Sequence, residues 1–169
     1  MTITFDGTAG ITTPAIINAN ANGIGNIGAS GATFNTIFAK ATSAQYADLA
    51  ECYAGDASYP SGTVVKFGGL QEITVAAQDH DPAVAGVVTT MPAVSMNTGL
   101  VASHVVNVAL VGRVPCRVQG PVNKGDLLVS AGNGCARSEK NPAPGTILGK
   151  AIEHFDGDTG VIEVAVGRP

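Results

Sequence analysis

Tryptophan is absent from this 169-residue sequence, and aromatic and charged side chains are both scarce. Aromatic residues make up 5% of the chain and charged residues 13%, which is roughly half of the usual share of charge in a soluble domain. A core must therefore be built mainly from Val, Ile, Leu and Ala. With 22 glycines in the chain, this composition favours short strands over long helices. The low charge indicates either an uncharged polar surface or a surface hidden against other copies.

Basic residues are also few, with nine Lys and Arg against thirteen Asp and Glu, so the net charge is −4. A nucleic-acid surface needs clustered Lys and Arg, and these basic residues are scattered. The stretch from Pro82 to Gly112 has no charged residue. However, Pro92 and several polar residues interrupt it well short of the roughly 20 apolar residues that a spanning helix needs. We expect no nucleic-acid partner and no membrane insertion.

The sequence shows no signature of a catalytic or metal site. Its three cysteines, Cys52, Cys116 and Cys135, lack the C-x-x-C spacing of zinc and redox motifs. Its three histidines have no ligand-spaced neighbours, so zinc is not expected. The first residues lack the basic and apolar regions of a secretory signal. We expect three reduced thiols in a protein made in a cytoplasm.

One motif suggests a cofactor but lacks the right context. The segment Gly23-Ile-Gly25-Asn-Ile-Gly28 satisfies G-x-G-x-x-G, and Asp48 follows at the distance expected of a ribose-binding acid. A dinucleotide site also needs a buried strand before the glycines and a helix start after them. The polar repeat Asn18-Ala-Asn20-Ala-Asn22 is no such strand, and Ala29-Ser-Gly31-Ala is no such helix start. We therefore expect no cofactor.

Residues 1–43 differ in composition from the rest of the chain, because only Asp6 and Lys40 are charged in this segment. Its apolar runs are two or three residues long, too short to offset the conformational entropy of ordering the segment in a single chain. The segment could order as a strand-like layer of an intertwined oligomer, or it could remain a disordered leader. We expect an extended segment that docks on a larger particle.

Residues 44–54 join this segment to the rest of the chain. Apolar residues on both sides of residue 43 follow the i, i+3, i+4, i+7 spacing of short helices. Such a stripe packs either against the rest of its own chain or against the same stripe in sister chains. We take it as the packing stripe of a trimer, with the members Phe34, Ile37, Phe38, Tyr46, Leu49 and Tyr53.

Residues 55–169 change to short apolar runs separated by turns. The runs Thr63–Phe67 and Glu72–Ala76 flank Gly68-Gly69 and predict a hairpin. The continuous run Val105–Val111 predicts a central strand buried on both faces. About nine such runs, with no long helix, predict a compact antiparallel β barrel or sandwich. The whole chain is thus expected to be mainly β, with an extended, intertwined leader before a β head domain.

The next run, Gly112–Val118, alternates apolar and polar residues. Val114, Cys116 and Val118 are expected to face inward, whereas Pro115 is expected to place the strand near a sheet edge.

Two loops of this domain are candidate receptor contacts, because binding residues are often carried on loops. The first contains Asp79, His80 and Asp81, whose side chains could hold a cation or simply form a solvated turn. The second runs from Met91 to Leu100 and includes Asn97.

Several segments together resemble fibre and appendage proteins of tailed bacteriophages. Residues 25–39 are similar to the segment that closes the shaft in that family, and Tyr46-Ala-Asp-Leu-Ala-Glu51 is similar to the motif that opens its terminal β domain. Further similar pieces follow in order, so that the resemblance covers residues 24 to 167. Among them are Pro60–Gly68, Val84–Val88, Val108–Val114, Lys124–Leu128, Gly149–Glu153 and Gly160–Gly167.

This resemblance implies a non-enzymatic virion protein, a small homotrimeric tail or baseplate fibre involved in host attachment. Its partners would be other virion proteins, through the N-terminal segment, and a host surface glycan or protein. A capsid-decorating head fibre is one alternative. A self-processing appendage peptidase is another, because the domain also resembles the self-cleaving domains of preneck appendages. A glycan hydrolase would need two carboxylates at a fixed separation, and the sequence fixes no such pair.

Overall fold

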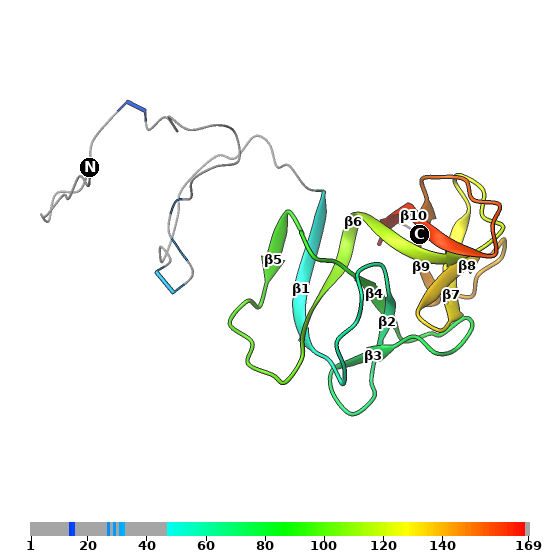
Figure 1. The fold of residues 1–169 in the computed structure, drawn as a ribbon. Helices are drawn as coiled ribbons and strands as arrows, with labels where there is room; N and C mark the ends of the chain where they lie inside the picture. The colour runs from blue at the N-terminus through cyan, green and yellow to red at the C-terminus, as the bar shows by residue number, and fades with distance from the viewer. Residues whose placement is uncertain (1–13, 16–26, 28, 30, 33–46, 168–169) are drawn as a thin grey trace, which may run out of the picture. The chain divides into compact units, whose positions relative to one another are not determined.

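The computed structural model of the chain describes residues 14–15, 27, 29, 31–32 and 47–167. The chain divides into two units, Met1–Ala41 and Thr42–Pro169, and the description below concerns residues 47–167 of the second (Figure 1). These residues form strands and no helix, so the predicted compact, mainly β domain is confirmed. The expected extended segment of residues 1–43, and the stripe residues Phe34, Ile37, Phe38 and Tyr46, lie outside the described residues.

The described domain contains ten strands, joined by turns in which glycine often adopts a left-handed backbone. The predicted hairpin across Gly68 and Gly69 is confirmed, since β2 and β3 pair antiparallel around it. The strands are β1 (Asp48–Ala54), β2 (Val64–Phe67), β3 (Ile73–Val75), β4 (Val84–Val88), β5 (Val94–Met96), β6 (Val105–Gln119), β7 (Leu127–Gly132), β8 (Cys135–Ser138), β9 (Ile147–Ala151) and β10 (Thr159–Val166).

Five of these strands close into a barrel. The ring runs β6, β10, β9, β7, β8 and back to β6, which it reaches through a parallel pairing of Val118 with Ala136. The other strands extend from β6, with β4, β2 and β3 in one series and β1 and β5 in another. Figure 1 shows the ring strands on one side of the domain and β1 and β5 on the other. Closure leaves the ring without a free edge.

Strand β6 is continuous over 15 residues and belongs both to the barrel and to the sheet formed by the strands outside it. Its first half pairs antiparallel with β1 and its second half with β10, and both pairings reach Gly112. The backbone of Gly112 is left-handed, with φ of 115°. A Cβ atom at this position would lie 2.1 Å from the carbonyl oxygen of Ala47. Glycine is therefore required at the point where β6 passes from one part to the other.

Two expectations for this strand need correction. The runs Val105–Val111 and Gly112–Val118 were expected to be separate strands, but a glycine within one strand lets the ladder continue through a bend. The first run is not buried on both faces, because Val105 and Val111 are both exposed. Continuous apolar sequence does not distinguish a strand buried on both faces from one that carries an apolar exposed face.

The strand that contains Pro115 is not an edge strand. It pairs with β10, and Pro115 stands opposite Glu163. The backbone C=O of Glu163 accepts a hydrogen bond from the N–H of Ile152, and the backbone N–H of Glu163 donates to the Glu153 side chain. Neither backbone group of Glu163 therefore points to β6. In such a pair no backbone hydrogen bond is exchanged, so the missing N–H of proline costs nothing there.

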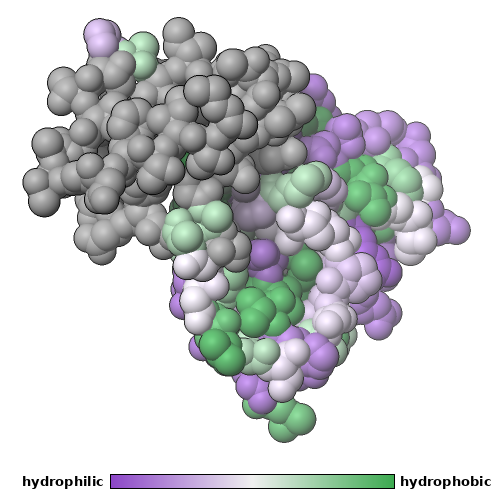
Figure 2. All heavy atoms as spheres, turned by 60° about the vertical axis from the view of Figure 1, so that its left-hand side comes forward, coloured by the Kyte–Doolittle hydropathy of each residue, from purple (hydrophilic) through white to green (hydrophobic). Residues whose placement is uncertain are grey.

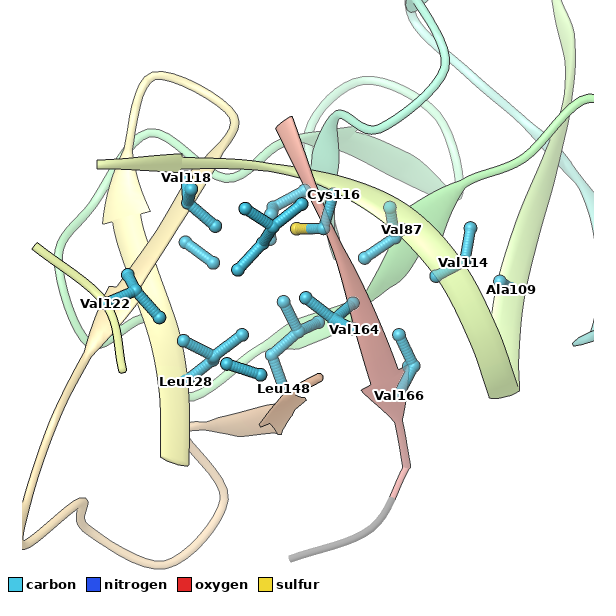
Figure 3. Packing of buried hydrophobic residues seen from close by; sticks show 14 of the residues in the cluster. Val87, Ala109, Val114, Cys116, Val118, Val122, Leu128, Leu148, Val164 and Val166 are labelled. Carbon is cyan, nitrogen blue, oxygen red and sulfur yellow. The ribbon is translucent and has the colours of Figure 1, made fainter. Parts of the chain in front are cut away.

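The barrel interior is filled by aliphatic side chains and one thiol (Figure 3). The predicted inward alternation of β6 is confirmed, since Val114, Cys116 and Val118 are buried. Leu128 of β7 and Leu148 of β9 fill the space that these side chains face. Burial removes the ionised form of the Cys116 thiol from water and so raises its pKa far above the ordinary range. A chain without tryptophan thus fills its barrel with small branched residues.

The stripe residues Leu49 and Tyr53 lie on a strand, and the expected helix in this segment is wrong. Residues Asp48–Ala54 form β1, in which buried and less buried side chains alternate. The spacing of four positions between Leu49 and Tyr53 also fits the period of two of an alternating strand. Ala50 and Ala54 are buried, and Leu49 and Tyr53 belong to the other face.

We predict that Gly112→Ala destabilises the domain by at least about 2 kcal/mol, since alanine is strained at this φ and its Cβ would meet a backbone oxygen. The free energy of unfolding in urea measures the loss. Gly99→Ala is the matched control, because a Cβ there has no atom within 4 Å. Equal stability of the two variants would contradict the role given to Gly112.

Candidate functional site

The sequence-predicted loop of Asp79 and His80 forms part of a charged network, which we call the Arg137 cluster: Asp79, His80, Arg137 and Glu139. The Arg137 guanidinium donates from Nε to Asp79 Oδ1 at 2.7 Å and from Nη1 to Glu139 Oε2 at 3.1 Å. The imidazole of His80 lies between the two acids, with Nδ1 2.9 Å from Asp79 and Nε2 3.0 Å from Glu139. The network ties the loop after β3 to the end of β8.

The charged groups of the Arg137 cluster shift one another's pKa values. The hydrogen bond from Arg137 lowers the pKa of Asp79 to about 2, and the same bond raises the pKa of Arg137. The pKa of Glu139 is also lowered, first by the backbone N–H of Asn141 and then by Arg137. Each charged group thus already has partners within the protein. This arrangement stabilises a loop and leaves little bonding capacity for a cation or a receptor.

Asp81, the third residue of the predicted loop contact, turns into the protein. It is 2% exposed, and its Oδ2 lies 2.8 Å from Nζ of Lys66. Burial alone would raise its pKa, but the bonds from Lys66 and from the N–H of Ala83 outweigh burial and lower it. Asp81 therefore holds the start of β4 against β2 and is not accessible to a receptor.

The second predicted loop contains a strand that sequence reasoning missed. Residues Val94–Met96 form β5, which pairs in parallel with β1. Asn97 follows in a left-handed conformation, and its Nδ2 donates to the carbonyl of Cys52 at 3.0 Å. Asn97 thus fixes the end of β5, whereas Met91 before the strand is exposed. A strand of three residues is too short to show an alternating pattern.

A pocket of about 380 Å³ lies where β1, β4, β6 and β10 meet, and we call it the Asp48 pocket. Asp48 is 4% exposed, and its Oδ2 has no hydrogen-bond partner within the described part of the chain. Two further charged groups line the pocket, Arg113 and Glu163, and the distance from Nε to Oε2 between them is 3.9 Å. The remaining lining residues are Ala47, Ser61, Thr89, Thr90, Met91, Val114 and Pro115.

Sequence reasoning did not find this pocket, because its residues come from five separate segments of the chain. In the sequence, Asp48 stands where a ribose-binding acid is expected, and nothing there marks it as part of a pocket. The bend at Gly112 brings Arg113 to the start of β1, where its N–H donates to the carbonyl of Ala47 at 3.3 Å. A signal was present in Gly112-Arg113, a glycine inside an apolar run, but its meaning depends on the long-range pairing of β6.

Within residues 47–167 and the few described before them, no group of three His, Cys, Asp or Glu side chains is placed to hold a metal ion. The helix search, limited to the same residues, finds none long and apolar enough to cross a membrane. No protein-family model matches the chain, and no curated protein matches it significantly. The Arg137 cluster and the Asp48 pocket therefore have to be interpreted from their own chemistry.

We predict that Asp79→Asn lowers the free energy of unfolding at pH 7 by less than about 1 kcal/mol, because half of this side chain is exposed to solvent. The pKa of Asp79 is lower in the folded state than its ordinary value of 3.8. Its stabilisation is therefore present above about pH 4 and is lost as the pH falls through about 2. Wild type and variant should thus converge at low pH in thermal unfolding, whereas the exposed-site control Asp158→Asn should match wild type throughout.

Proposed function

We propose that this chain is a structural protein of a bacteriophage particle, a small trimeric tail or baseplate fibre involved in host attachment. In this proposal the β domain is the head and the preceding segment docks on other virion proteins. Two arguments support it. One is the resemblance of residues 24 to 167 to fibre and appendage proteins, and the other is an apolar surface on the β domain suited to association with further copies.

The apolar surface is the exposed part of the face of β5, β1 and β6 that carries Leu49, which we call the β5–β1–β6 face. Further along the same face, three side chains pack in a core cluster of the domain itself, namely Tyr53, Val106 and Val108. Val94, Leu49 and Val111 stand side by side across the three strands. Their exposed fractions are 54%, 36% and 44%. Met96 of β5 lies on the same face beside Glu51 and is also exposed. Figure 2 turns the side of the domain that carries β5 forward and shows hydrophobic side chains gathered there.

The position of this face supports association. Contiguous apolar surface on a soluble protein commonly marks an interaction site. β5 pairs with β1 alone among the described strands, so its other edge presents backbone groups as well as side chains. The low charge of the whole chain agrees with a protein that buries surface between copies. The face belongs to β1, the first strand after the segment that was expected to intertwine.

The number three and the phage particle come from the resemblance. Mounting on the capsid as a head fibre is the first alternative. A self-processing peptidase or a glycan hydrolase is the second, because the same family resemblance includes self-cleaving domains. The Asp48 pocket holds two carboxylates, but the Arg113 guanidinium lies 3.9 Å from one of them, so the pocket is not built from a pair of acids alone. The structural role is therefore favoured.

We expect the chain to have three times its 16.9 kDa monomer mass in solution, as measured by light scattering after gel filtration. Val94→Asp should shift the mass towards the monomer, because it puts a charge on the exposed edge strand of the β5–β1–β6 face. Val161→Asp is the control, since Val161 is equally exposed but lies on β10. A monodisperse monomer for the wild-type chain would reject the fibre.

Intact-mass spectrometry separates the structural role from self-processing. The purified chain should keep its full mass through days of incubation. Ser58 Oγ lies 3.1 Å from His104 Nδ1, but this pair is exposed, and no acid among the described residues orients the imidazole as a catalytic base requires. The three thiols are buried, and burial raises the pKa of the Cys116 thiol, which disfavours its reactive form. Two fragments whose masses sum to that of the chain would establish the peptidase alternative.

A further inference from the structure

The Asp48 carboxyl differs from the other buried acid of the domain, Asp81, in having no cation among the described residues beside its unpaired oxygen. Asp81 is 2% exposed and meets the ammonium of Lys66 at 2.8 Å. Asp48 is 4% exposed, yet its Oδ2 finds no donor in residues 47–167 or in the other described positions. Buried acceptors without donors are uncommon in folded proteins, because they lose their bonds to water and gain none in return. The domain thus satisfies one buried acid internally and leaves the other available.

The surroundings of Asp48 combine charge with an apolar wall. Glu163 adds a second carboxylate, whereas Arg113 adds one guanidinium, so the pocket carries one more negative than positive group. Arg113 and Glu163 are 3.9 Å apart at their nearest charged atoms, which is a loose pair. The sides of the pocket are formed by Ala47, Met91, Val114 and Pro115.

This combination fits a long basic side chain. Lysine and arginine have an aliphatic stem that packs on apolar surface and a charged end that donates several hydrogen bonds. Ala47, Met91 and Pro115 match the stem, and Asp48 and Glu163 match the charged end, whereas the Val114 side chain packs in the barrel core. A volume of about 380 Å³ is at the small end of ligand pockets, which suits one side chain better than an extended ligand.

We propose that the Asp48 pocket binds a lysine or arginine side chain presented by a partner protein, with the cation donating to Asp48 Oδ2. Lys66 and Asp81 show the same kind of pair formed within one chain. The proposal names the chemistry of a partner and does not depend on the phage assignment.

The partner is a different protein and not a second copy of this chain. Asp48 and Leu49 are neighbours on β1, so their side chains point to opposite faces of the strand. The β5–β1–β6 face, proposed to join copies, contains Leu49. The Asp48 carboxyl, which is the acceptor in this proposal, therefore lies on the opposite face of β1 from the side chains proposed to join copies.

The test is a titration of the isotopically labelled full chain with N-acetyl-lysine methylamide, followed through the amide chemical shifts of residues lining the pocket. We expect saturable shifts at Ala47, Asp48, Thr90 and Arg113, with dissociation in the millimolar range for a single side chain. N-acetyl-norleucine methylamide keeps the stem without the charge and should give no saturable shift. Failure of the lysine probe to bind, or equal binding of both probes, would overturn the proposal.

Three variants assign the binding to the pocket. Asp48→Asn should weaken the lysine probe at least about tenfold, because a charged acceptor becomes a neutral amide, whereas the exposed control Asp158→Asn should bind like wild type. Thr90→Arg should abolish binding by placing a guanidinium at the rim, and it keeps the test valid if Asp48→Asn does not fold. Arg113→Ala should tighten binding several-fold. It removes a guanidinium that repels the cationic probe, and it leaves Glu163 without its partner Arg113. Unchanged affinity in all three would place the probe elsewhere and overturn the proposal.

The same samples separate this proposal from the proposed function. The lysine probe should leave the solution mass unchanged. If saturating probe lowers the mass, a second copy fills the pocket and the assignment to a different protein is wrong. If the chain is a monomer and binds the probe, the fibre proposal is rejected and the binding role of the Asp48 pocket stands. If the chain is a trimer and does not bind the probe, the binding role is rejected and the fibre proposal stands.

Discussion

The architecture depends on one constraint, the unbroken run of β6 from the outer sheet into the barrel wall. Backbone hydrogen bonding has to be satisfied along the whole strand, so β1 and β10 take successive halves of it. The two ladders meet at Gly112, where a side chain would collide with the backbone of Ala47. The barrel, the β5–β1–β6 face and the Asp48 pocket all adjoin this crossing, so their geometry is coupled through one residue without a side chain.

The charged groups of the domain fall into two kinds. Asp79 and Asp81 are neutralised locally, one by Arg137 and one by Lys66, and both pairs fix loops to strands. Asp48 and Glu163 are incompletely neutralised and line one pocket. In a chain with so few charges, an acid that remains unpaired inside the fold is a stronger indication of a binding role than the same acid on an ordinary charged surface.

Much of the β domain could be predicted from its sequence, because turn residues and alternation are local signals. The alternation of Val114, Cys116 and Val118 and the hairpin at Gly68 and Gly69 depend only on neighbouring residues, and both were predicted correctly. The helical spacing of Leu49 and Tyr53 was misleading, because Asp48, two alanines and Cys52 supply the buried face of β1, and this face is not apolar enough to reveal the period of two. The Asp48 pocket could not be predicted, since it depends on which strands pair across long stretches of chain.

Barrel closure has a consequence for biosynthesis. The ring is completed by β10, whose partner β6 lies far upstream, so this pairing cannot form until β10 has left the ribosome. Until then β6 lacks its second partner, and the apolar side chains meant for the interior remain open to water. The interior of the barrel is therefore covered only after all five ring strands have been synthesised.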